Sequence, residues 1–343
     1  MKSIRAVGRR TAGLLLALSL VSVATGCGGD SASDAADGGP QKVKFGYIAD
    51  YSGSVALAVA QKQGLWKKSG VTPELKVFTN GPLQVQALGS GSLDFGYLGP
   101  GALWLPASGR ASIVSVNMLG LADRVIARPG SGIEKPADLK GKKVAVAEGT
   151  SGDMILDLAL SEAGLKPDDV TKVAMDASTV VTAFSSGKVD AAATWYPLID
   201  TMKKNVPGLK EISRTQDYYP KLTFPNVFVT QPKLASGNPE LVKKVTGVLK
   251  EAGDWIAAHP EESETVSADF LKLPAGQLKG STKYVKLLPS AELTKLSKDG
   301  TVDGWFDELA AMFGRMGKLP KPGKAEDYYL GDLYAEAGKA DRS

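Results

Sequence analysis

The sequence contains one cysteine and one histidine among 343 residues, which leaves little material for the commonest catalytic and metal-binding sites. A zinc cluster needs several Cys or His ligands, and a Ser-His-Asp triad needs a histidine beside its nucleophile. His259 stands in AAHPEES, directly before a proline, where a solvated turn at a helix end is expected. We therefore predict no catalytic residue, no metal site and no cofactor.

The glycine-rich signatures of nucleotide binding are also missing. No G-x-x-x-x-G-K-[ST] loop occurs, and the segment GKKVAVAEGTSGD has the wrong glycine spacing for a dinucleotide. Asp168 and Asp169 follow Pro167 in an expected loop, where acidic residues more often cap a turn than act as an acid and base pair. These absences favour binding without reaction.

No segment approaches the roughly 18 uninterrupted apolar residues of a membrane-spanning helix. The first 26 residues instead place four basic residues ahead of a short apolar run at 14–21, which is typical of a secretory signal peptide. Removing residues 1–26 removes four basic and no acidic groups, so the formal net charge falls from +4 to about 0. We expect no nucleic-acid partner, because such a chain has no obvious phosphate-binding surface.

The signal peptide ends in VATGC, and its last residue is Cys27. A lone thiol cannot form an internal disulfide. The segment resembles the bacterial lipobox, whose cysteine is lipidated and becomes the new N-terminus, although Ala24 stands where leucine is usual. Residues 27–41 are rich in Gly, Ser and Asp and predict a flexible tether. We expect lipid attachment at Cys27 and a location on the outer face of the cytoplasmic membrane or in the periplasm.

From residue 42 onward strand-like and helix-like segments alternate, which favours an α/β architecture with largely parallel sheet. The segments 121–128 and 225–230 predict two crossover strands of a hinge. We therefore expect a discontinuous lobe 1 over 42–124 and 229–320, a lobe 2 over 125–228, and a C-terminal tail over 321–343. Helices prevail after residue 238, with Asn238 and Ser290 as expected caps.

Two strand-to-helix corners could hold a small anion. The segment SLDFGYLGPGAL runs an expected strand into a Gly-Pro-Gly turn at 99–101, and Thr150 and Ser151 precede an expected helix. Helix N-termini present unpaired N–H groups and a partial positive charge. The glycines could equally serve packing alone, Thr150 or Ser151 could be only a cap, and Asp153 could only complement the helix dipole.

A second group of candidates is acidic and aromatic. Asp50 and Tyr51 follow the first expected strand, Asp123 lies at the first crossover, and Trp195 and Tyr196 follow AAAT. The two aromatic residues could form a wall for an aliphatic segment or a cation, with burial of Trp195 in the core as the alternative. Asp50 and Asp123 could receive an ammonium, or be solvated. An anion site combined with a carboxylate would suit a zwitterion.

Five segments in order carry a resemblance to a known family: QKQGLWKKSGV, ALGSGSLDFGYLGPGAL, GIEKPADLKGKKVAVAEGTSG, FSSGKVDAAATWYP and NPELVKKV. Over residues 42–335 the chain resembles substrate-binding proteins of ABC importers for taurine and aliphatic sulfonates, within the wider nitrate, sulfonate and thiamine-precursor group. The resemblance implies a periplasmic-binding-protein type II fold, with two lobes of mixed and parallel sheet flanked by helices and a two-strand hinge. It also implies a ligand cleft between the lobes, and a permease and an ATPase as partners. We expect a monomer.

The same resemblance supplies the expected ligand-binding residues, which are Asp50, Tyr51, Gly99, Gly101, Asp123, Thr150, Ser151, Asp153, Trp195, Tyr196 and Asn226. Two of them depart from the family pattern. Asp153 stands where many sulfonate binders carry His, and Tyr196 stands where several carry Asp. A carboxylate at 153 would oppose a neighbouring sulfonate, so either Asp153 points away or the ligand brings a positive group.

These observations lead us to expect a lipid-anchored, non-catalytic solute-binding protein for a small sulfonate or zwitterion, with taurine as the leading candidate. The alternative is an exported pyrimidine-precursor (thiamine pathway) binding protein or enzyme on the same fold. An enzyme would need a reactive Cys or His in the cleft, and Cys27 and His259 fall elsewhere in the sequence. A sensor or adhesion module with this fold would have the same sequence features.

Overall fold

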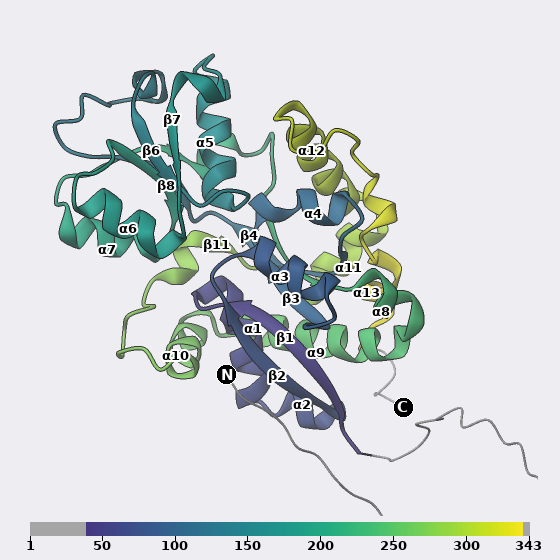
Figure 1. Ribbon diagram of the computed structural model, residues 1–343. Helices are drawn as coiled ribbons and strands as arrows, with labels where there is room; N and C mark the ends of the chain where they lie inside the picture. Colours follow the sequence, from purple (N-terminus) through teal and green to yellow (C-terminus); the bar gives the residue numbers. More distant parts are fainter. Residues whose placement is uncertain (1–38, 339–343) are drawn as a thin grey trace, which may run out of the picture. The chain divides into compact units, whose positions relative to one another are not determined.

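The computed structural model describes residues 39–338, which form two β-sheets with helices on their faces (Figure 1). The expected signal peptide, Cys27 and all but the last residues of the expected tether lie outside the described residues. Within residues 39–338, the helices are too short or too polar to cross a membrane.

The first sheet has six strands in the order β11-β4-β10-β3-β1-β2. Their bounds are β1 (Gln41–Ile48), β2 (Val71–Phe78), β3 (Phe95–Leu98), β4 (Ser112–Gly120), β10 (Pro225–Thr230) and β11 (Val285–Lys286). Strand β1 runs parallel to β2 and β3, whereas β10 runs antiparallel to both β3 and β4. The sheet is therefore mixed in direction.

The second sheet has five strands in the order β7-β6-β8-β5-β9. Their bounds are β5 (Asp123–Ala127), β6 (Lys143–Val146), β7 (Thr171–Ala174), β8 (Ala191–Trp195) and β9 (Lys210–Arg214). Strand β6 runs parallel to β7 and β8, and β5 runs antiparallel to β8 and β9. Both sheets thus carry antiparallel strands next to the points where the chain changes sheet.

The helices connect these strands and supply the outer layers (Figure 1). Their bounds are α1 (Tyr51–Lys62), α2 (Leu65–Lys68), α3 (Gly81–Gly89), α4 (Trp104–Ala107), α5 (Ser151–Glu162), α6 (Ala177–Ser185), α7 (Leu198–Asn205), α8 (Pro232–Gly237), α9 (Pro239–Ala258), α10 (Pro260–Phe270), α11 (Ser290–Lys298), α12 (Thr301–Arg315) and α13 (Gly331–Glu336).

The central strands are covered on both faces, and β10 is accordingly buried along its whole length. Val227 and Val229 of β10 pack in a core with residues of α3, α4 and α12, while Phe228 between them packs with α1 and α9 on the opposite face. In the second sheet, Val125 faces α5 and Ile126 faces α6 and α7. Each sheet is the middle of three layers.

Helix α5 contacts both halves of the fold, where one half is built on the six-stranded sheet and the other on the five-stranded sheet. Ile155 and Leu156 pack on the five-stranded sheet, whereas Met154 and Leu158 belong to the core over the six-stranded sheet. Gly152 allows close approach to β8, because a Cβ there would lie 2.6 Å from the Ala193 carbonyl oxygen. The N-terminus of α5 is therefore held firmly where the two halves meet.

The predicted fold class, with two mixed and parallel sheets flanked by helices, is confirmed. The sheets divide the chain a few residues away from the expected lobe boundaries, because Asp123 and Arg124 pair in the five-stranded sheet and residues 225–228 pair in the six-stranded one. The expected limits of lobe 1 (42–124 and 229–320) and lobe 2 (125–228) stay a prediction. The chain changes sheet at residues 121–122 and 215–224.

Several local details differ from the expectation. Asn238 caps α9 as predicted, and its side chain accepts a hydrogen bond from Leu241 N. Ser290 is not a cap; it is the first residue of α11 and donates its N–H and hydroxyl to Asp254. The described part of the expected tail packs on the fold, since Tyr334 of α13 is fully buried.

Candidate functional site

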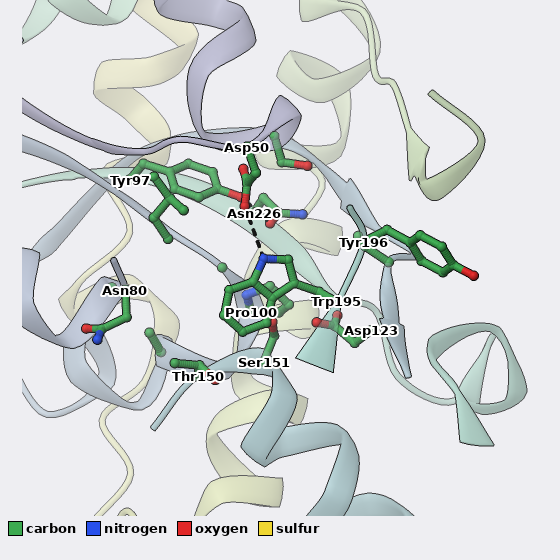
Figure 2. A pocket seen from close by; sticks show the side chains of 17 residues that line it. Asp50, Asn80, Tyr97, Pro100, Asp123, Thr150, Ser151, Trp195, Tyr196 and Asn226 are labelled. Atoms are coloured by element: carbon green, nitrogen blue, oxygen red, sulfur yellow. Dashed lines mark hydrogen bonds between the residues drawn. The ribbon is translucent and has the colours of Figure 1, made fainter. Parts of the chain in front are cut away.

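A small cavity of about 40 Å³ lies where loops from the carboxyl ends of strands in both sheets converge (Figure 2). One bound water needs roughly 10–15 Å³ of cavity volume, so the space suits a ligand of a few heavy atoms. Eight of the eleven expected residues line it: Asp50, Gly99, Asp123, Thr150, Ser151, Trp195, Tyr196 and Asn226.

Asp50 enters the cavity from the six-stranded sheet, at the end of β1. It caps α1 by accepting a hydrogen bond from Gly53 N at 2.8 Å, and its second oxygen accepts one from the indole Nε1 of Trp195 at 3.2 Å. Burial raises the pKa of Asp50 to about 6, against the lowering effect of these two hydrogen bonds and with a contribution from the charge of Asp123. The indole bond joins the two halves of the fold.

Asp123 enters the same cavity from the five-stranded sheet, at the start of β5. Its side chain is 3% exposed, and its Oδ1 has no hydrogen-bond partner within the described structure. Burial raises the pKa of Asp123 to about 6, although Ser151 and the charge of Arg124 act to lower it. An unpartnered buried carboxylate oxygen is costly, so it marks a place where a ligand donor is wanted.

The neighbouring Arg124 does not reach into the cavity. Its Nη1 donates to the carbonyl oxygens of Leu121 and Asp123 at 2.8 and 2.7 Å, and its Nε donates to Glu211 at 2.9 Å. Within the described part of the chain, the residues that line the cavity include no Lys, Arg or His. The side chains around the cavity therefore carry negative charge only.

An aromatic and amide group forms another part of the lining. Tyr97 of β3 donates its hydroxyl to Asn226 Oδ1 at 2.6 Å, and both residues are buried. Figure 2 shows the Trp195 ring extending into the space below Asp50, with Asp123 close by. These rings offer faces to a flat or cationic group.

The two corners predicted as anion sites touch one another. A Cβ on Gly101 would lie 2.1 Å from the Thr150 carbonyl oxygen, so glycine is required for this contact between the two halves. Gly101 does not line the cavity, and the N–H of the next residue, Ala102, is bonded to Gly99 O at 3.0 Å. The expected cradle at 99–101 is thus mainly a packing contact.

Thr150 occupies the N-cap position of α5 without a side-chain cap bond, since its hydroxyl donates to Ala147 O at 2.6 Å. Thr150 and Ser151 line the cavity, which places the first turn of α5 beside it. A 12-residue helix presents unpaired N–H groups and partial positive charge at its start, so this end of the cavity can accept an anionic group.

Asp153 points away from the cavity into a cluster of four buried or half-buried charges. It pairs with Lys172 at 2.9 Å and Lys318 at 2.6 Å, and both lysines also reach Asp157. Burial acts to raise the pKa of Asp153, but the two ammonium groups outweigh it and the pKa is lowered. Lys318 follows α12, so the cluster ties the C-terminal helices to α5.

Tyr51 and the hydroxyl of Tyr196 are also engaged elsewhere. Tyr51 lies outside the cavity and bonds Ser263 of α10 at 2.7 Å. Tyr196 borders the cavity, but its ring extends away from the other labelled residues (Figure 2). The ring stacks on that of Tyr284, with 3.9 Å between the ring centroids, and its hydroxyl donates to Glu211. Ligand contact by these residues stays a prediction that the geometry does not favour.

Sequence reasoning missed two polar lining residues, Asn80 and Tyr97, whereas Ser52 and Ala122 lie in loops that the family resemblance assigns to the cleft. Asn80 follows the end of β2 and caps α3, so the rule that placed the other corners at strand ends would have found it. Tyr97 lies within β3, and its inward direction depends on strand pairing. Over residues 39–338, no group of three or more His, Cys, Asp or Glu is placed to hold a metal ion.

Comparison with known proteins finds relatives that are similar to this chain in sequence. A protein of Brucella abortus named as a binding protein is 52% identical over 292 residues, covering 85% of this chain and 91% of its own. The taurine-binding periplasmic protein of Escherichia coli is 28% identical over 276 residues, covering 76% of this chain and 82% of its own.

The solved structure of the periplasmic aliphatic sulphonate binding protein of Escherichia coli is similar in fold, with a TM-score of 0.64 and 23% identity over 86% of this chain and 99% of that one. The family model described as NMT1/THI5 like matches residues 52–263, which include all the cavity-lining residues except Ile48 and Asp50. The expected resemblance is therefore confirmed. The chain belongs to the NMT1/THI5-like family, whose relatives include periplasmic binding proteins for taurine and aliphatic sulfonates.

Proposed function

We propose that the protein is a lipid-anchored, extracytoplasmic solute-binding protein of an ABC importer, which captures a small sulfonate or zwitterion of the taurine type and delivers it to a permease. The observation that carries this proposal is the cavity itself, which draws lining residues from both sheets. The family membership and the taurine-binding and sulfonate-binding relatives support the importer role and the ligand class.

The cavity offers complementary ends to a zwitterion. The first turn of α5, at Thr150 and Ser151, presents partial positive charge to an anionic group, while Asp50 and Asp123 present negative charge to an ammonium. Charged hydrogen bonds contribute about 1.5–3 kcal/mol each, so three or four of them support a micromolar site after ordering costs.

Capture requires the two halves to separate and close. The Asp50–Trp195 bond and the Gly101–Thr150 contact both cross between the halves, so a ligand that enters between the halves has to separate these contacts. We propose that these contacts open together and that movement occurs at residues 121–122 and 215–224, where the chain changes sheet.

A pyrimidine-precursor binding protein is the second candidate. The aromatic side chains Tyr97 and Trp195 and the two carboxylates would suit a flat aminopyrimidine ring. Chemistry on such a ring is disfavoured by a lining that offers no His, Cys or Lys.

Thermal unfolding of the mature chain against a panel of small ligands tests the proposal. The panel is taurine, ethanesulfonate, nitrate, guanidinium and an aminopyrimidine. A ligand present at 100 times its Kd stabilises the folded state by about 2.7 kcal/mol, which raises Tm measurably. We expect such a rise with at least one member, and no rise with any member at millimolar concentration would overturn the proposal.

The proposed lipid anchor has its own test. The variant Cys27→Ser should release the protein from washed membranes.

A further inference from the structure

The charges around the cavity narrow the ligand class beyond a small sulfonate or zwitterion. Asp50 and Asp123 come from different sheets and line one cavity, at 9% and 3% exposure. Nearby basic side chains are engaged elsewhere: Arg124 binds two carbonyls and Glu211, and Lys172 and Lys318 bind the Asp153 and Asp157 carboxylates. Among residues 39–338, no basic side chain therefore forms an ion pair with either cavity carboxylate.

The available acceptors are specific atoms. Asp123 Oδ1 is buried without any hydrogen-bond partner in the described structure, and Asp50 Oδ2 accepts one bond, from the Trp195 indole at 3.2 Å. Buried acceptors are usually paired in native folds, so Asp123 Oδ1 is open to a donor from a ligand. Two carboxylates that face one space are best satisfied by one group that carries positive charge and several N–H donors.

The aromatic lining agrees with a cationic group. Trp195 and Tyr97 border the same space, and Figure 2 shows the indole between the two carboxylates. Ring faces attract cations and repel anions. A plain alkanesulfonate or nitrate would meet carboxylates and ring faces over most of the lining, with only the first turn of α5 to attract it.

We propose that the cavity selects ligands by a positively charged nitrogen group with at least two N–H donors, an ammonium or amidinium, which Asp50 and Asp123 bind together. This inference rests on the proposed function, because it takes the cavity as the capture site. An anionic group at the other end of the ligand is accepted at α5 but is not what defines the ligand class. Taurine fits by its ammonium, and unsubstituted sulfonates do not fit.

Calorimetric titration of the mature wild-type chain with matched ligand pairs tests this. The pairs are taurine against 2-hydroxyethanesulfonate, and acetamidinium against acetamide, so that each pair changes the charged nitrogen and keeps the size. We expect the charged-nitrogen member of at least one pair to bind about 10- to 100-fold more tightly. The variants D50N and D123N should each remove this preference, while D168N, which removes an exposed acid far from the cavity, should keep it.

The outcomes separate the two proposals. The inference is overturned, and the importer role stands, if 2-hydroxyethanesulfonate or ethanesulfonate binds wild type as tightly as taurine does. The same holds if acetamide binds as tightly as acetamidinium. If the preference survives in either D50N or D123N with folding intact by circular dichroism, the assignment to this carboxylate pair is overturned. If no panel member binds wild type, the proposed function fails and this inference fails with it.

Discussion

Asp123→Asn should stabilise the unliganded protein while weakening ligand binding. The carboxylate is buried at 3% exposure with Oδ1 unpartnered, and its pKa rises from 3.8 to about 6 on folding. A shift of about two pKa units corresponds to about 3 kcal/mol of differential free energy between protonation states. The folded state therefore carries a penalty of that order when Asp123 is ionised.

The pH dependence of this penalty follows from its sign. The folded pKa lies above the unfolded one, so below about pH 4 the group is protonated in both states and the penalty vanishes. Between about pH 4 and 6 the penalty grows, and above about pH 6 it is fully present. Asp50 is also buried, with its pKa raised to about 6, so it adds a penalty with the same pH dependence. The positive charge of the nearby Arg124 reduces the penalty at Asp123.

Asparagine keeps the side-chain shape and removes the charge, but its amide needs partners of its own, so we expect a net gain of about 1–2 kcal/mol at about pH 8. For about 300 folded residues that corresponds to a Tm increase of about 1.5–3 °C, because the entropy of unfolding is about 2.1 cal/mol/K per residue. The assay is calorimetric unfolding of ligand-free wild type, Asp123→Asn and the exposed control Asp168→Asn, at about pH 8 and about pH 4. A Tm decrease for Asp123→Asn at the higher pH, or a gain that is equal at both pH values, would refute the reasoning.

Three further variants probe the contacts between the halves. Lys318→Met leaves the buried Asp153 cluster with one ammonium, so we expect unfolding free energy to fall by about 2–4 kcal/mol at neutral pH. That loss should shrink on acidification, since the lowered pKa of Asp153 makes its contribution disappear as it protonates. Gly101→Ala should hold the halves apart, seen as expansion in solution scattering, because its Cβ would lie 2.1 Å from Thr150 O. Trp195→Phe removes the indole bond across the cavity, and its affinity in titration calorimetry should fall by about tenfold or less, with folding retained.

The sequence predicted the parts of the site that depend on strand ends. Asp50 and Thr150 each directly precede a helix at the carboxyl end of a buried strand, and parallel strands bring such ends together. Trp195 closes a strand whose register with β5 sets it opposite Asp123. These positions follow from local pattern and topology, so they could be found without knowing the tertiary contacts.

The residues that were misplaced depend on partners far away in the chain. Asp153 is drawn from the cavity by Lys318, 165 residues later, and the Tyr196 ring stacks on Tyr284. Gly101 was interpreted as a source of free N–H groups, whereas its function in the fold is to let the backbone at Thr150 approach. Local spacing carries no information about such long-range contacts, which form only when the two sheets pack.

Titration calorimetry of wild type and Gly99→Leu tests the central claim that the cavity captures the ligand. Gly99 has φ −75° and ψ 165°, which any residue adopts, and a Cβ there would lie 3.8 Å from both Ser151 Oγ and Asn226 Oδ1. Leucine would thus fill the cavity without changing charge or backbone. We predict one-to-one binding of a panel ligand to wild type and no detectable binding to the folded variant. Equal affinity of the two proteins would contradict the account.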